Sequence, residues 1–263
     1  MKAPDTKSTR EGTFHALAWV EGHAGVLPQL RKLLQEYARA SERDFPWRHS
    51  TDPYQVLLAE VLLQRTAARS VVVGVWHDLI RRYPDASALA AAPLEEIEAA
   101  IRPLGLTKRA KALQQLARTV VRETGGRIVA DAAFLESLPG LGSYGANAVL
   151  SFAYNIKAAV VDANAVRVYS RIGGFSPITR RQGLAYATVI ADLVVTQDSH
   201  REVNYGLLDF AARICKPRPL CHKCPALPLC QYGRERGFAL SHSRVEDEVL
   251  PQAQVGRTPD PKD

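Results

Sequence analysis

The sequence predicts an all-α protein, and three observations support this fold class. Between about residues 25 and 214, apolar residues recur at the three- and four-residue spacing of amphipathic helices, as in Leu27, Leu30, Leu34 and Tyr37. The alternation typical of β-strands is scarce. Glycine, proline or capping aspartate residues interrupt the stretch at intervals, as expected of turns between helices. With 263 residues, 46% of them hydrophobic, the chain can form one large or two modest domains.

Both ends of the chain are interpreted as polar tails. Residues 1–24 lack the apolar stretch of an export signal, and no run approaches the roughly 18 apolar residues of a membrane span. Residues 235–263 contain acidic and proline-rich runs that are too poor in apolar residues to fold alone. We therefore expect a cytoplasmic protein. Its formal net charge of +7 implies attraction to polyanions, although many basic proteins bind no nucleic acid.

A helix predicted from Tyr54 to Leu63 is apolar almost all round and carries a single acidic residue, Glu60. Burial disfavours the ionised form of a carboxylate, so we expect the pKa of Glu60 to be raised. A carboxyl group of this kind is a candidate general acid or a group that positions water. The alternative is a structural ion pair between Glu60 and a buried arginine.

The segment from Leu138 to Ala148 places Gly140 and Gly142 between the end of one predicted helix and the start of the next. Glycines permit positive φ angles and close approach of the backbone. Such a hairpin directs backbone N–H groups and the positive end of the second helix towards one point, which suits a phosphate oxygen. The alternative is an ordinary tight connection between helices.

Asp162 follows an apolar segment and opens the next predicted helix. Taken alone, an aspartate in this position is most simply an N-cap, because its side chain can accept hydrogen bonds from the first backbone N–H groups of the helix. A catalytic role needs support from the rest of the chain.

All four cysteines of the chain lie within sixteen positions, as Cys215-x5-Cys221-x2-Cys224-x5-Cys230. Thiolates so close together can bind one metal centre, whereas the disulfides of an exported protein would be spread through a small chain. Zinc sites usually pair two Cys-x2-Cys knuckles, and this chain has one. The uneven spacing favours an iron–sulfur cluster over zinc, with unligated thiols as the third possibility.

In this order, the glycine hairpin, the valine–aspartate helix start and the four cysteines resemble the helix-hairpin-helix DNA glycosylases of the endonuclease III/MutY superfamily (HhH-GPD). The resemblance covers about Phe45 to Cys230 and includes the run Phe45-Pro46-Trp47-Arg48. It implies a six-helix barrel domain over residues 51–157, and a helical domain that carries a [4Fe-4S] cluster, built from residues 25–50 and 158–234. DNA would lie across the cleft between these two lobes. One spacing departs from the family, since relatives commonly have six residues between the first two cysteines and this chain has five.

The resemblance also implies catalytic roles for Asp162, Glu60 and Tyr144. Asp162 would be the carboxylate that stabilises positive charge on the deoxyribose or orients water, after the base has left the stack. Bifunctional relatives carry a lysine where this chain has Tyr144. A phenol cannot form a Schiff base, so we expect a monofunctional enzyme. The alternative is that Tyr144 only packs against the barrel.

Position 144 also bears on the substrate. Adenine glycosylases of the MutY type commonly have serine there, whereas glycosylases for thymine or uracil mispaired with guanine have tyrosine. We therefore expect excision of thymine or uracil opposite guanine. The alternatives are an adenine glycosylase that acts opposite guanine or 8-oxoguanine, and a DNA-binding iron–sulfur protein without catalytic activity.

By the same resemblance, the expected partner is double-stranded DNA that contains a mismatched or damaged base, bound by a monomer associated with the nucleoid and not with a membrane. Candidate DNA contacts lie at the end of the Glu60 helix, in the hairpin and in a basic loop. They are Gln64, Arg65, Thr66, Leu138, Gly140, Gly142, Ser143, Lys108 and Arg109.

Overall fold

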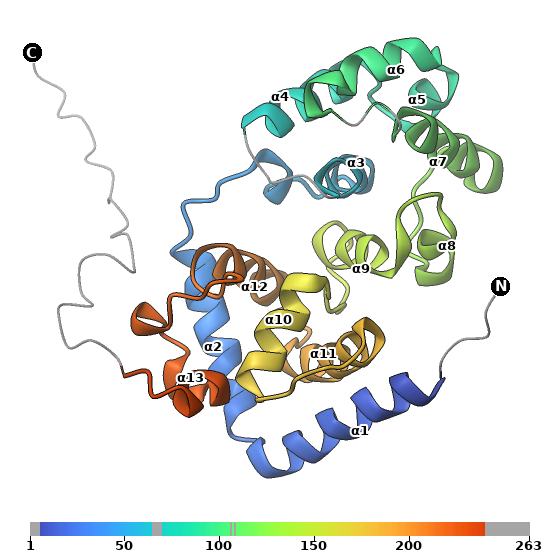
Figure 1. Cartoon of the computed structure of the whole chain (residues 1–263). Helices are drawn as coiled ribbons and strands as arrows, with labels where there is room; N and C mark the ends of the chain where they lie inside the picture. Colours follow the sequence, from blue (N-terminus) through green and yellow to red (C-terminus); the bar gives the residue numbers. More distant parts are fainter. Residues whose placement is uncertain (1–5, 65–69, 106, 108, 240–263) are drawn as a thin grey trace, which may run out of the picture. The chain divides into compact units, whose positions relative to one another are not determined.

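The computed structural model describes residues 6–64, 70–105, 107 and 109–239, and these residues form helices and no strand (Figure 1). The predicted all-α fold class is confirmed. None of the described helices is long and apolar enough to cross a membrane.

In chain order the α-helices are α1 (Thr6–His23), α2 (Val26–Arg39), α3 (Pro53–Leu63), α4 (Ser70–Arg82), α5 (Ala86–Ala91), α6 (Leu94–Ile101), α7 (Arg109–Thr124), α8 (Ala132–Ser137), α9 (Gly142–Phe152), α10 (Ala163–Ile172), α11 (Arg180–Val194), α12 (His200–Arg213) and α13 (Gln231–Glu235). The short 3-10 helices of the described residues are η1 (Pro46–Arg48), η2 (Arg102–Leu104), η3 (Cys221–Lys223) and η4 (Leu227–Leu229).

The chain divides into two compact units. Unit 1 comprises residues up to 43, residues 164–186 and residues from 202 onward, and unit 2 comprises residues 44–163 and 187–201. The glycine hairpin, Glu60 and Asp162 therefore belong to unit 2, and the cysteines belong to unit 1. The segment 187–201, which the sequence analysis placed in the cluster-bearing domain, lies in unit 2.

The N-terminal segment is not a tail over its described part, because residues 6–23 form α1. Its buried residues are Ser8, Gly12, Ala16 and Trp19, and the first three are too small or too polar to form an apolar stripe with the tryptophan. A Cβ atom on Gly12 would lie only 2.3 Å from the backbone oxygen of Gln182. The helix is thus held by close backbone approach, and this leaves little hydrophobic signal.

In unit 1, the apolar stripe predicted for α2 is buried as expected, and Tyr37 packs edge-on against Phe210 of α12 with ring centroids 5.6 Å apart. Gly206 lets these helices approach, since a Cβ atom there would lie 1.9 Å from the oxygen of Leu34. The fully buried Asp209 carboxylate accepts a hydrogen bond of 3.0 Å from Arg43. Such a pair offsets the cost of burying a charge.

In unit 2, α3 packs against α4 and α9, while α7 packs against α5 and α6 (Figure 1). The start of α3 is fixed by Asp52, whose side chain accepts hydrogen bonds from the backbone N–H groups of Tyr54 and Gln55, and by Pro53 in the first turn. Nearly every residue of α3 is buried. This explains its apolar sequence and leaves Glu60 inside the unit.

Candidate active site and cysteine cavity

The hairpin between α8 and α9 has the geometry that its glycines predicted. Gly140 and Gly142 have φ angles of +82° and +66°, which favour glycine. Gly140, Gly142 and Ser143 are exposed at the start of α9, where the first backbone N–H groups have no partner within the helix. Leu138 differs, because its side chain is only 2% exposed and anchors the turn in the core. Any contact from Leu138 to a ligand must therefore come from its backbone.

Two of the other candidate DNA contacts have intramolecular partners. The side-chain amide of Gln64 donates a 2.6 Å hydrogen bond to the carbonyl of Gly140 and thus ties the end of α3 to the hairpin. Arg109 donates hydrogen bonds to the carbonyl groups of Val61, at 3.2 Å, and Leu62, at 3.3 Å, and to that of Gln64. These are the last carbonyls of α3, so Arg109 caps that helix. The predicted contacts Arg65, Thr66 and Lys108 lie outside the described residues.

Glu60 faces Tyr144 across the contact between α3 and α9. The carboxyl group is 6% exposed, and the Tyr144 hydroxyl donates a hydrogen bond to it. The other side-chain oxygen, Oε2, is buried and has no hydrogen-bond partner among the described residues. Glu60 therefore lies inside the unit with one oxygen held and one unsatisfied.

Four influences set the proton affinity of Glu60. Its pKa is raised from 4.5 to about 7: burial is the largest cause, the nearby Asp162 carboxylate adds to the rise, and the Tyr144 hydrogen bond and the Arg48 guanidinium oppose it. Asp162 directly precedes α10, at the end of a segment that Asn147 of α9 ties down by a 2.8 Å hydrogen bond to the carbonyl of Ala159. The three predicted catalytic residues thus share one electrostatic environment.

Arg48, the last residue of the run Phe45-Pro46-Trp47-Arg48, contributes to the site in a way that the sequence did not predict. The Arg48 guanidinium stacks over Phe45 at 5.6 Å and lowers the pKa of Glu60. Its backbone carbonyl accepts a 2.5 Å hydrogen bond from Arg201, which also donates to the carbonyl of Phe152 at 2.7 Å. Arg201 follows Arg48 by 153 positions, so only the folded structure reveals this support.

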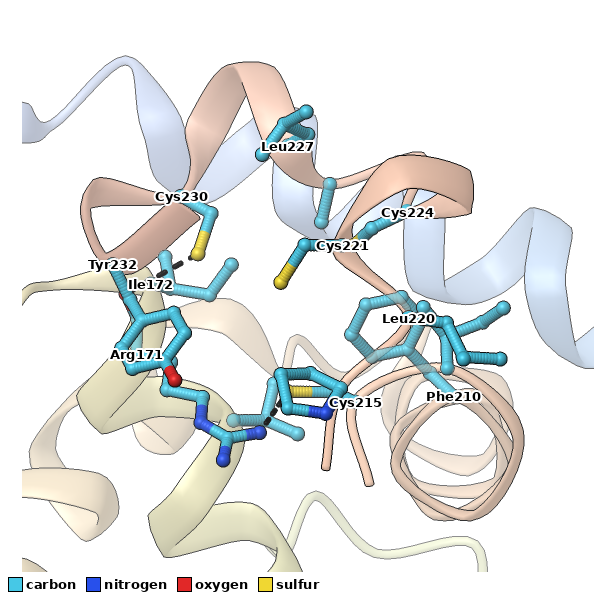
Figure 2. A pocket seen from close by; sticks show the side chains of 14 residues that line it. Arg171, Ile172, Phe210, Cys215, Leu220, Cys221, Cys224, Leu227, Cys230 and Tyr232 are labelled. Atoms are coloured by element: carbon cyan, nitrogen blue, oxygen red, sulfur yellow. Dashed lines mark hydrogen bonds between the residues drawn. The ribbon is translucent and has the colours of Figure 1, made fainter. Parts of the chain in front are cut away.

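The four cysteines are buried, free of disulfides and gathered around one cavity in unit 1 (Figure 2). Cys215 follows α12, Cys221 begins η3, Cys224 directly follows η3, and Cys230 directly precedes α13. Apolar residues such as Phe210 and Leu227 complete the lining of the cavity. The structure therefore brings together the thiols that the sequence placed within sixteen positions.

The surroundings of the thiols favour neutral sulfur in the absence of a cation. Burial raises the pKa of Cys224 to about 12, and it also raises the pKa of Cys221 and Cys230. Arg171 donates a 3.5 Å hydrogen bond to the Cys215 sulfur and accepts one of 3.3 Å from the Cys230 thiol through its backbone carbonyl. In the part of the chain that the structure describes, no three His, Cys, Asp or Glu side chains form a group that could hold a single metal ion.

Comparisons with known proteins agree with this geometry. Residues 58–188 match the model of the HhH-GPD superfamily of base excision DNA repair proteins. A thymine-DNA glycosylase of Aeropyrum pernix is 38% identical over 77% of this chain and 92% of its own length. A thymine/uracil-DNA glycosylase of Methanothermobacter thermautotrophicus is 40% identical over 72% of this chain and 86% of its own. The solved structure of a thermostable thymine-DNA glycosylase superimposes with a TM-score of 0.76 at 36% identity, covering 81% of this chain and 98% of that chain. The chain belongs to the HhH-GPD superfamily of base excision DNA repair proteins.

Proposed function

We propose that the protein is a monofunctional DNA glycosylase that hydrolyses the N-glycosidic bond of thymine or uracil mispaired with guanine. The proposal rests mainly on Tyr144. Its phenol occupies the hairpin position where strand cleavage would need an amine, and it donates a hydrogen bond to Glu60. The names of the relatives support the same substrates. The enzyme therefore leaves an abasic site and does not cut the strand efficiently.

The site residues divide the chemistry between two carboxyl groups. Asp162 stabilises the positive charge that develops on the deoxyribose, or orients the attacking water, once the base has been flipped out of the duplex. Glu60, with a pKa of about 7, exchanges a proton readily near neutral pH, which suits a group that positions water or protonates the departing base. Tyr144 fixes the orientation of the Glu60 carboxyl group.

The exposed hairpin supports binding to duplex DNA through its backbone N–H groups. Gly140, Gly142 and Ser143 lie where a phosphate oxygen can accept from the first turn of α9. We infer that the protein acts as a monomer on DNA of the nucleoid, in the cytoplasm.

We also infer that Cys215, Cys221, Cys224 and Cys230 hold a [4Fe-4S] cluster. A single zinc ion would draw four sulfurs to about 2.3 Å from one point, whereas a cluster binds one cysteine at each iron and spaces the sulfurs apart. Four buried, free thiols around one cavity can supply one cysteine to each iron of such a cluster. Bound there, the iron core of the cluster would supply the positive charge that stabilises the buried thiolates. Chemical analysis should find roughly four irons and four sulfides per chain, and stoichiometric zinc without iron would contradict the assignment.

Single-turnover excision of thymine from a T·G duplex tests the proposed role of Asp162. The variant Asp162→Asn should lose excision by at least about a thousandfold, because the amide cannot stabilise the charge on the sugar. Asp131→Asn is the matched control, since Asp131 also precedes a helix and accepts a 2.6 Å hydrogen bond from the N–H of Phe134. Excision that survives in Asp162→Asn would contradict the proposed role of Asp162, and absence of excision by the unaltered protein would favour a DNA-binding protein without catalytic activity.

A further inference from the structure

Unit 1 contains a second cavity of about 330 Å³ beside the cysteine cavity. It lies between α10, the turn that follows α10, and α13. The two cavities share Arg171 and Tyr232 in their walls, and Figure 2 shows both residues from the side of the cysteines. The volume is in the range of small-ligand sites.

Positive charge dominates the lining of this second cavity. Three arginines, Arg167, Arg171 and Arg236, and one carboxylate, that of Glu235, line the cavity. Glu235 Oε1 accepts a 2.8 Å hydrogen bond from Gln231. Within the described residues, neither Arg171 nor Arg236 forms an ion pair with a carboxylate. The Arg171 guanidinium donates hydrogen bonds to the carbonyl groups of Lys216, at 2.6 Å, and Pro217, at 2.9 Å, so it offers the cavity chiefly its positive charge. Three positive groups and one negative group leave a net charge of +2, which suits an anion.

A buried hydroxyl group in the lining lacks a hydrogen-bond partner within the part of the chain that the structure describes. Ser170 of α10 is 6% exposed, and its Oγ has no partner among the described residues. A serine inside a helix usually donates to the carbonyl four residues before it, and this one does not. A buried donor without an acceptor is costly, and an anion in the cavity would satisfy it.

The aromatic rings in the lining are occupied, which argues against stacking of a nucleobase. Arg171 and Arg236 lie over the Tyr232 ring, at 4.9 and 3.7 Å from its centroid. Phe175 packs against Tyr186 at 4.5 Å and against His15 at 5.0 Å. The cavity therefore offers charge and hydrogen bonds rather than a free aromatic face.

We propose that this cavity binds a phosphate group, held by Arg236 and by the hydroxyl of Ser170, with Arg171 adding positive charge. Phosphate matches arginine because its oxygens accept parallel N–H bonds and carry the opposite charge. The phosphate is either a free anion or part of a nucleic-acid backbone, and these two sources share the same recognition chemistry. The site lies wholly in unit 1 and does not depend on the proposed glycosylase activity.

The competing hypothesis is that the arginines bind no ligand and serve only to balance negative charge on the cysteines. Arg171 and Arg236 both lower the pKa of Cys221, so their field reaches the thiols. This role predicts that Arg236→Gln changes the iron content or the cluster spectrum and leaves phosphate binding unchanged. The two roles are separable in one set of variants.

The test is calorimetric titration of the full-length iron-loaded protein with inorganic phosphate at low ionic strength. Arg236→Gln should weaken binding about tenfold, and Ser170→Ala should weaken it several-fold without changing the charge. Arg234→Gln is the matched control, because Arg234 is an exposed residue of α13, two positions before Arg236, and does not line the cavity. Absence of phosphate binding by the unaltered protein, or equal losses in Arg234→Gln and Arg236→Gln, would overturn the proposal.

A second titration, with an undamaged DNA duplex over a range of salt concentrations, identifies the source of the phosphate. If the site holds a backbone phosphate, Arg236→Gln should reduce the salt dependence by about one phosphate contact relative to Arg234→Gln. If the slope is unchanged while phosphate binding is lost, the ligand is a free anion. Both results support a phosphate site, and neither depends on base excision.

Discussion

The buried carboxyl group of Glu60 should make the stability of the protein depend on pH. Its pKa is raised from 4.5 to about 7, chiefly by burial. This difference corresponds to about 3 kcal/mol of unfolding free energy, at about 1.4 kcal/mol per pH unit. Because the pKa is higher in the folded protein than in the unfolded chain, the cost is absent below pH 4.5. It grows as the pH rises and is complete above about pH 7.

The variant Glu60→Gln removes the charge and keeps the size of the side chain. At about pH 8.5 it should be more stable than the unaltered protein by up to about 3 kcal/mol, and at about pH 4.5 the two should be nearly equal. Thermal unfolding measures the difference, which should appear as roughly 5–10 °C in Tm for a chain of this length. Excision should fall in the same variant, because the amide cannot exchange the proton that the Glu60 carboxyl group is proposed to transfer.

The control is Glu21→Gln, which neutralises an exposed glutamate of α1 and should change Tm little at either pH. A stability difference for Glu60→Gln that does not vary with pH would refute the raised pKa. A variant less stable than the unaltered protein at about pH 8.5 would mean that the Glu60 charge is well compensated by Arg48 and Tyr144.

Three further outcomes are expected. Tyr144→Lys places an amine at the hairpin and should allow covalent trapping to DNA by borohydride. Tyr144→Phe should only shift the Glu60 limb of the pH–rate profile to higher pH, because the hydrogen bond that it removes lowers the pKa of Glu60. Trapping by Tyr144→Phe would contradict this reasoning. Arg109→Met removes the cap of α3 and should lower the unfolding free energy by about 1–3 kcal/mol in urea titrations, and a loss below about 0.5 kcal/mol would argue against capping. Gly140→Ala should cost about 1 kcal/mol from its positive φ angle alone, since the nearest atom to a new Cβ is 4.0 Å away; a larger loss would show that the hairpin cannot accept a side chain.

Much of the site was predictable because its chemistry is concentrated in short segments. Glu60 stands out as the only charge in an apolar helix, and the glycines of the hairpin have the positive φ angles that their spacing predicted. The cysteines lie around one cavity because only a few residues separate them. In each case a local pattern determines the geometry.

The features that were missed depend on residues far apart in the chain. Helix α1 is held by small residues and close backbone contact, which give no apolar stripe. The guanidinium of Arg109 caps a helix that ends 46 residues earlier, a role that the sequence did not predict. The hydrogen bond from Arg201 to the Arg48 carbonyl joins residues 153 positions apart in the chain. No local pattern reports such hydrogen bonds.

The most direct test of the proposed function is single-turnover excision on matched duplexes that contain T·G, U·G, A·G or adenine opposite 8-oxoguanine, each read with and without alkali. The arrangement of Tyr144, Glu60 and Asp162 predicts cleavage of the T·G and U·G duplexes, and only after alkali. Cleavage confined to the adenine duplexes would show that Tyr144 does not indicate the substrate and that the protein is an adenine glycosylase. Efficient cleavage without alkali would contradict the monofunctional mechanism.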